Sequence, residues 1–119
     1  MVKFLPMKLQ QTIFDLKPFV IGMVHLQALP GSPGFAGSLS DVLEAASKDA
    51  SLLAKGGVDA IMVENFFDVP FTPSRVETET VSAMTLAVSE VANSARAVTA
   101  DIPIGVNVLR NDGLSAMAI

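Results

Sequence analysis

Three apolar runs of this sequence each stop at polar side chains whose types suit proton transfer or anion binding. These side chains are His25, then Glu64 and Asn65, and then Asn107, Arg110, Asn111 and Asp112. Near-continuous runs of valine, isoleucine and leucine are typical of buried parallel strands. In parallel α/β sheets and barrels, ligands bind at the carboxyl ends of such strands. We therefore expect the three polar clusters to meet at one ligand-binding edge.

His25 and Glu64 are the first two candidates for catalytic residues. An imidazole at a strand end can act as an acid, a base or a ligand, although a lone histidine can also be half-buried and bonded to a backbone carbonyl. His25 is the only histidine, so no two-histidine metal site is expected. Glu64 follows a buried strand, where a carboxylate needs a partner. It either transfers protons or forms a structural salt bridge, for which Arg110 is the obvious partner.

Asp112 is the third catalytic candidate, and the remaining polar residues are candidates for ligand binding. Arg110 has the forked donors that clamp a phosphate or a carboxylate. Asn111 and Asp112 could serve the site, or they could cap the helix that follows them. Asp68 lies in a phenylalanine-rich loop that could shield a site from water, and it could equally form an Asx turn. The ligand-binding set is completed by Asn65 and Asn107.

The spacing of apolar residues predicts alternating strands and helices. In chain order these are a helix over 8–16, a strand over 19–24, a helix from about 40 to 55, a strand over 60–63, a helix over 81–95, a strand over 102–109 and the first turns of a helix over 114–119. Ser40 is the expected N-cap of the first long helix, and Gly56–Gly57 its expected left-handed end. Long loops over 27–39 and 65–77 follow the first two strands. Because loops of this length are usually functional, they favour the carboxyl ends as the active edge.

This alternation predicts an α/β fold with a parallel sheet and right-handed crossovers. Three strands cannot close a barrel, because a barrel of this kind needs eight. We therefore expect one partial domain over 1–119, in which 1–17 form a leader and 18–119 form the amino-terminal portion of a (β/α)8 TIM-like barrel. The alternative is a small open three-layer sandwich, which should cover its edge strands with polar residues.

The composition excludes several classes of protein. Half of the 119 residues are hydrophobic, which suffices for the core of one small domain. The formal charge is −4 and the basic residues are scattered, so nucleic acid is not an expected partner. The chain has no cysteine, which mildly favours a reducing compartment. Its uninterrupted apolar stretch over 19–26 is too short to span a membrane, so we expect a cytoplasmic protein.

Several short blocks of sequence together resemble the BtpA family. The blocks are Val20–Leu26 with Leu29–Pro33, Gly56–Ala60 with Val63–Phe66, Asp68 with Pro70–Phe71, and Gly105–Asp112. The eight polar candidates named above fall on the family's motif positions. The sequence departs from the family at Gln27–Ala28, where prolines are common, and at Phe67, where a small residue is usual. Family members are similar to phosphate-binding barrels of roughly twice this length, which again implies an amino-terminal part.

The resemblance implies two classes of function. The family is associated with biogenesis and stability of photosystem I-type membrane complexes, which implies peripheral association with such a complex at a thylakoid surface and a small-ligand site at the barrel mouth. The contact with the complex could then be formed by Phe66, Phe67 and Phe71. The alternative is a metabolic enzyme that acts on a small metabolite, phosphorylated or not, with Arg110 as the anion clamp. No cofactor is identified. An incomplete barrel also exposes apolar surface, so self-association or pairing with a missing carboxyl-terminal half is expected.

Overall fold

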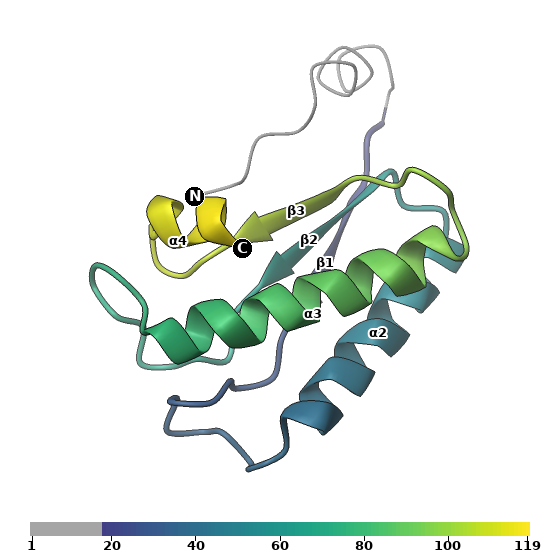
Figure 1. Cartoon of the computed structure of the whole chain (residues 1–119). Coiled ribbons are helices and arrows are strands. Elements are labelled where there is room, and N and C mark those ends of the chain that lie inside the picture. The colour runs from purple at the N-terminus through teal and green to yellow at the C-terminus, as the bar shows by residue number, and fades with distance from the viewer. Residues whose placement is uncertain (1–17) are drawn as a thin grey trace.

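The structure is a computed structural model that describes residues 18–119, so the helix predicted over 8–16 lies outside the described residues. Strands and helices alternate as the sequence predicts, which confirms the α/β class (Figure 1). The elements are β1 (Ile21–His25), α2 (Leu39–Lys55), β2 (Ala60–Glu64), α3 (Thr78–Arg96), β3 (Ile104–Asn107) and α4 (Gly113–Ala118).

The three strands form one parallel sheet in the order β1-β2-β3. In its register, His25 is paired with Glu64, and Glu64 is paired with Asn107. The strands therefore end at one edge, where His25, Glu64 and Asn107 lie next to one another as predicted. Long loops follow β1 and β2, whereas only residues 108–112 join β3 to α4.

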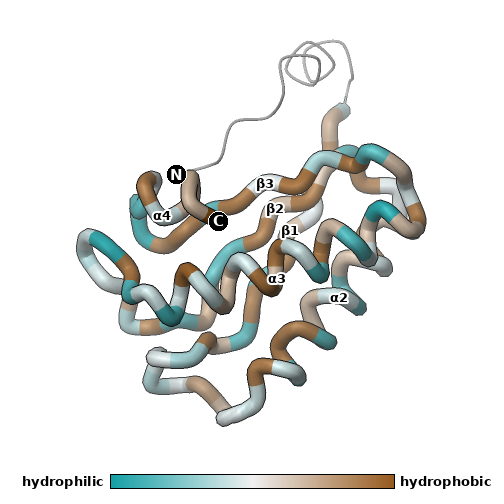
Figure 2. Tube along the Cα trace, viewed as in Figure 1, coloured by the Kyte–Doolittle hydropathy of each residue, from teal (hydrophilic) through white to brown (hydrophobic). Residues whose placement is uncertain are grey.

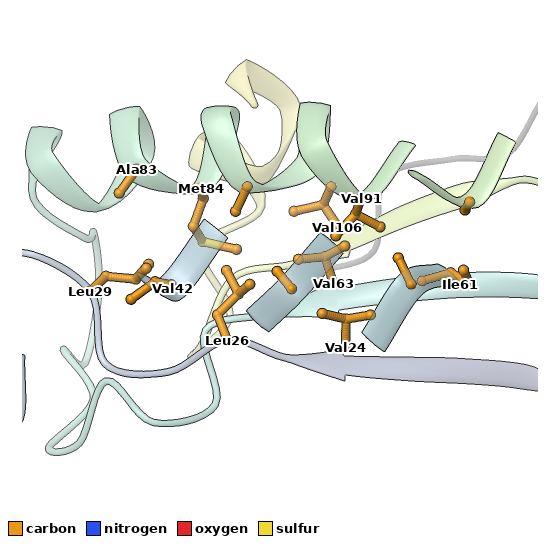
Figure 3. Packing of buried hydrophobic residues seen from close by; sticks show 14 of the residues in the cluster. Val24, Leu26, Leu29, Val42, Ile61, Val63, Ala83, Met84, Val91 and Val106 are labelled. Atoms are coloured by element: carbon orange, nitrogen blue, oxygen red, sulfur yellow. The ribbon is translucent and has the colours of Figure 1, made fainter. Parts of the chain in front are cut away.

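Helices α2 and α3 lie side by side and cover the same face of the sheet (Figure 1). Val24, Val63 and Val106 project from the three strands toward these helices and are almost fully buried (Figure 3). Hydrophobic residues run along the strands and alternate with hydrophilic ones along both helices (Figure 2). The core therefore lies between the sheet and one layer of helices.

Within residues 18–119, no layer of helices covers the opposite face of the sheet. Successive strand residues point to opposite faces, so this face carries Ile21 and Met23 of β1, with exposed fractions of 45% and 42%. Parallel sheets are normally covered on both faces. The open apolar face is therefore unusual, and it is also the face from which His25, Glu64 and Asn107 project.

The first long helix begins earlier than predicted. Its N-cap is Ser38 rather than Ser40, because the Ser38 hydroxyl accepts a hydrogen bond from the amide of Asp41. The far end of this helix agrees with the prediction, since Gly57 has the left-handed conformation, with φ of 83°. Both serines are suitable capping residues, so composition alone does not separate them.

The third strand is shorter than the predicted run over 102–109. After Asn107 the chain turns, and the carbonyl of Val108 accepts a hydrogen bond from the amide of Asp112 instead of extending the ladder. Helix α4 then begins at Gly113, one residue before its predicted start. Residues 108–109 are therefore part of a turn, and Val108 is apolar because it is fully buried there rather than because it is paired in a strand.

Candidate functional site

Three polar side chains lie next to one another across the strand ends, and we call them the polar ladder: His25, Glu64 and Asn107. Nε2 of His25 is 3.3 Å from Oε2 of Glu64, and the side-chain amide of Asn107 donates a hydrogen bond to Oε1 of Glu64. Because these residues are paired in the register, they project from the open face of the sheet. The Glu64 side chain is only 12% exposed, and residues of both neighbouring strands contact its carboxylate.

The imidazole of His25 is also stacked on an aromatic ring. The ring centroids of His25 and Phe66 are 4.2 Å apart with an interplanar angle of 9°, and Phe67 meets Phe66 edge to face. The His25 side chain remains 38% exposed. One face of the imidazole is covered and one nitrogen is directed at a carboxylate, while the ring stays accessible. This geometry suits proton transfer, because the carboxylate orients the ring and the second nitrogen can exchange a proton with a ligand.

Asn65 points away from the polar ladder and joins two strand-end loops. Its Oδ1 accepts a hydrogen bond from the amide of Leu109 at 2.7 Å, and its Nδ2 donates to the carbonyl of Leu109 at 3.3 Å. Nδ2 also donates to Oδ2 of Asp68 at 3.4 Å. Asn65 is 1% exposed. The Asn65 side chain therefore connects the segment that follows β2 to the segment that follows β3.

Asp68 connects the same region to the loop that follows β1. Its Oδ1 accepts a hydrogen bond from the amide of Leu29 at 2.7 Å. Burial raises the pKa of Asp68, although the hydrogen bonds from Leu29 and Asn65 act in the opposite direction. The Asp68 amide in turn donates to the carbonyl of Asn65, which closes a local turn. Asp68 thus has a structural role as well as a place among the ligand-binding candidates.

Asp112 is the N-cap of α4, so the capping alternative is the one that the structure shows. Its Oδ1 accepts from the amide of Ser115, and its Oδ2 accepts from the Ser115 hydroxyl and from the amide of Val76. Burial acts to raise the pKa of Asp112, but these hydrogen bonds and the positive charge of Arg75 together lower it. None of these hydrogen bonds reaches the polar ladder, so a catalytic role for Asp112 gains no support.

Arg110 and Asn111 lie exposed in the short connection between β3 and α4. The suggested salt bridge between Arg110 and Glu64 is absent from residues 18–119, because the ion-pair partner of Glu64 there is His25. Asn111 has φ of 64°, a left-handed conformation that asparagine tolerates better than most residues. It does not provide the side-chain cap of α4. Arg110 remains an accessible cation near the polar strand ends.

Two contributors were not anticipated from the sequence. The sequence indicates Phe66 only as an apolar loop residue, because its stacking on His25 depends on a loop path that no local pattern reveals. Ser115 was not singled out, although it lies three residues after Asp112 in the spacing typical of an N-cap and its partner. That spacing could have favoured capping over catalysis for Asp112.

Neither a metal site nor a membrane span is found in the part of the chain that the structure describes. Within residues 18–119, no three histidine, cysteine, aspartate or glutamate side chains are grouped so as to hold a metal ion. Within the same range, no helix combines the length and the apolar character needed to cross a membrane.

The fold and the strand-end residues define a parallel α/β protein with a polar cluster at the carboxyl ends of its strands. Residues 16–119 match the BtpA family, and the chain belongs to this family. The resemblance inferred from the sequence is thereby confirmed. No solved structure matches the chain.

Relatives of the chain occur in bacteria, archaea and an animal. It is 51% identical to the photosystem I biogenesis protein BtpA of Synechocystis, over 95% of this chain and 37% of that protein. It is 45% identical to an uncharacterized protein of Thermococcus kodakarensis, over 89% of this chain and 38% of that protein. It is 35% identical to an uncharacterized mitochondrial protein of Caenorhabditis elegans, over 87% of this chain and 37% of that protein. The matches thus span little more than a third of these relatives, less than the half implied by the resemblance.

Proposed function

We propose that this chain forms the amino-terminal part of a (β/α)8 barrel whose mouth holds a small-ligand site. In such a barrel one face of every strand packs on helices and the other lines the interior. Here α2 and α3 cover one face, and Ile21 and Met23 lie on the open one. The greater length of the relatives supports the same arrangement.

The buried Glu64 carboxylate, held between His25 and Asn107, is the observation that carries this proposal. The three side chains lie at the carboxyl ends of the strands and project from the face that would line the barrel. Ligands of α/β barrels bind at that end. We assign proton transfer to His25, oriented by Glu64, and orientation of the carboxylate to Asn107.

The ligand that fits this site best is a small polar metabolite, phosphorylated or not. Arg110 is exposed three residues beyond the polar ladder and has the forked donors that bind a phosphate or a carboxylate. We therefore assign Arg110 the role of an anion clamp at the rim of the mouth. Asn111, next to it, is an accessible hydrogen-bonding group for the same ligand.

The proposal can be tested in a full-length chimaera that joins residues 16–119 of this chain to the remaining part of the Synechocystis relative. Melting temperatures are measured with a panel of sugar phosphates and the corresponding free sugars. A ligand of the site should raise the melting temperature by about 5 °C at saturation. Arg110→Ala should remove the preference for the phosphorylated form, and Glu64→Gln should reduce the rise for both forms.

Arg96→Ala is the matched control, because Arg96 is an exposed arginine at the far end of α3. Its chimaera should respond to ligands as the unmodified chimaera does. The ligand-site proposal fails if no compound raises the melting temperature of a cooperatively folded chimaera. It also fails if Arg110→Ala and Glu64→Gln leave the ligand response unchanged.

A second candidate function is peripheral participation in the assembly of a photosystem I-type complex at a thylakoid surface. It is favoured by the name of the Synechocystis relative and by a loop with exposed Phe66, Phe67 and Val69. Relatives in organisms without photosynthesis favour the ligand site as the more general function. In a cyanobacterium lacking its own BtpA, assembly through this loop predicts that Phe67→Ser in the chimaera lowers photosystem I accumulation while Arg110→Ala does not.

We also propose that the isolated 119-residue chain self-associates through the open face of its sheet. Met23→Lys should shift the sedimentation profile toward the monomer, because a charge opposes burial of that face against another copy. Leu86→Lys is the matched control, since Leu86 is 51% exposed on α3. A monomeric unmodified chain, or equal effects of the two substitutions, would contradict self-association through this face.

A further inference from the structure

A small cavity lies between the strand-end loops and the first turn of α3, separate from the polar ladder. Its volume is about 80 Å³, and its walls include Ser32 from the loop after β1, Asp68 and Thr72 from the loop after β2, and Glu77 and Thr80 from the start of α3. None of the three residues of the polar ladder lines it. The cavity is therefore a second place at which the same loops can hold a ligand.

Two hydroxyl groups in the walls of this cavity lack hydrogen-bond partners. The Oγ of Ser32 and the Oγ1 of Thr72 are buried atoms, and neither has a partner among residues 18–119. Buried polar atoms are nearly always hydrogen-bonded, because leaving one unpaired is energetically unfavourable. Two hydroxyls without partners, from two different loops, are therefore available to pair with a polar ligand in the cavity once their side chains rotate toward it.

The charges in the walls of the cavity determine which charge a ligand bound there can carry. Asp68 and Glu77 are carboxylates, whereas no lysine, arginine or histidine lines the cavity. Arg75 is the cation nearest to Glu77 in the sequence, but it does not line the cavity, and its charge lowers the pKa of Asp112. Burial raises the pKa of Asp68, and the groups that act against burial are the hydrogen bonds from Leu29 and Asn65 rather than a cation. A phosphate would meet two carboxylates there without a cation, so an anion is the wrong ligand.

The cavity has room for a group of a few heavy atoms and is partly open to solvent, so it can hold the end of a larger molecule. Its volume of about 80 Å³ exceeds the roughly 10–15 Å³ that a single water molecule requires. A protonated amino group on a short carbon chain fits this volume, and its three N–H donors match a carboxylate and two hydroxyl oxygens.

We propose that this cavity binds the protonated amino group of a small amine, with Asp68, Ser32 and Thr72 as acceptors. Binding requires the two hydroxyls to turn toward the cavity by rotation about χ1, which changes only the side-chain rotamer. This amine site does not rest on the ligand site proposed at the barrel mouth, because the two sites share none of their binding residues. A ligand that filled it would join the loops after β1 and β2.

The proposal is tested by titrating the isotope-labelled 119-residue chain with ethanolamine, which is protonated at neutral pH, and following amide chemical shifts. Ethylene glycol is the uncharged control of similar size, and inorganic phosphate is the anionic control. Ethanolamine should produce saturable shifts at Ser32, Asp68 and Thr72, whereas the two controls should not. The carboxyl carbon of Asp68, titrated with acid in the presence of saturating ethanolamine, should show a lower pKa than in its absence.

Thr72→Val separates binding from folding. It removes an unpaired hydroxyl while keeping the shape of the side chain, so the melting temperature without ligand should not fall. Ethanolamine should nevertheless bind about tenfold more weakly, because a hydrogen bond to a charged group is lost. Thr85→Val is the matched control, since Thr85 is exposed on α3 and bonds within its own helix.

Three results would overturn the amine site. They are the absence of ethanolamine-dependent shifts up to about 0.1 M ligand, equal shifts with phosphate or ethylene glycol, and an unchanged affinity in Thr72→Val. A lower melting temperature for ligand-free Thr72→Val would show that its hydroxyl already has a partner, which also contradicts the proposal. Asp68→Asn gives an independent check, because it keeps an acceptor for the amide of Leu29 while removing the charge.

Discussion

Replacing Asn65 with alanine is expected to lower the free energy of unfolding by about 3 kcal/mol, the largest effect of any single substitution considered. The asparagine is 1% exposed and pairs with both the amide and the carbonyl of Leu109. Alanine would leave these backbone groups without their side-chain partner at a buried site. It would also remove the weaker hydrogen bond to Asp68, so the loop after β2 would lose its connection to the chain leaving β3.

The measurement is urea denaturation of the full-length chimaera described above, followed by circular dichroism. Asn93→Ala is the matched control, because Asn93 is exposed on α3 and alanine favours a helix. Small domains have a total stability of about 5–15 kcal/mol, so a loss of this size is a large fraction of it and readily measured. A loss below about 1 kcal/mol for Asn65→Ala would mean that the two loops are held together without this side chain.

The sequence predicted that the polar strand ends meet at one edge, but it did not predict which of them touch. Glu64 was expected beside Arg110, and it contacts His25 and Asn107 instead. Two-residue periodicity explains the difference. Asn107 is paired with Glu64 in the register and projects from the same face, whereas Arg110 lies beyond the end of β3. Choosing the partner requires the register, which depends on the packing of neighbouring strands.

The role of Asn65 could not have been predicted, for a related reason. It is the immediate neighbour of Glu64, and the alternation of side chains directs the two residues to opposite sides of the sheet. Its partners are backbone atoms of a loop 44 positions away along the chain. A local pattern identifies a polar residue at a strand end, but it does not distinguish a ligand-binding amide from one that replaces a missing backbone partner.

The element order was predictable because burial imposes a period on the sequence. The spacings of three and four residues along 42–54 and 81–95 correspond to the buried sides of α2 and α3. The boundaries were less predictable. Ser38 and Ser40 are both acceptable N-caps, and a buried valine such as Val108 is compatible with either a strand or a turn. Helix and strand ends depend on single hydrogen bonds, which leave a weaker signal than a buried face.

Replacing Asp112 with alanine is expected to lower the free energy of unfolding by about 2–3 kcal/mol at neutral pH. The substitution removes the cap of α4 and leaves three donors without an acceptor: the amide and the buried hydroxyl of Ser115, and the amide of Val76. The hydrogen bond from the Val76 amide connects α4 to the segment before α3, so its loss affects more than the six residues of α4. Asp112→Asn should cost less, because one carbonyl oxygen can still accept from the Ser115 amide.

The same side chain should make the protein sensitive to acid in a way that identifies it. Hydrogen bonds and Arg75 outweigh burial and hold the pKa of folded Asp112 below its ordinary value of 3.8. The folded state then binds fewer protons than the unfolded state, so this contribution is present above about pH 4 and is lost as the pH falls through the lowered value. Asp68 acts in the opposite direction, because its raised pKa means that protonation favours the folded state.

Comparing unfolding free energies of wild type and variants from about pH 7 to pH 3 separates these contributions. The difference between wild type and Asp112→Ala should shrink as the pH falls, because acid has already removed part of what the substitution removes. Asp49→Asn is the control for a general change of charge, since Asp49 is exposed on α2, and its curve should parallel that of wild type. A difference between wild type and Asp112→Ala that stays constant with pH would show that the cap does not depend on the ionised carboxylate.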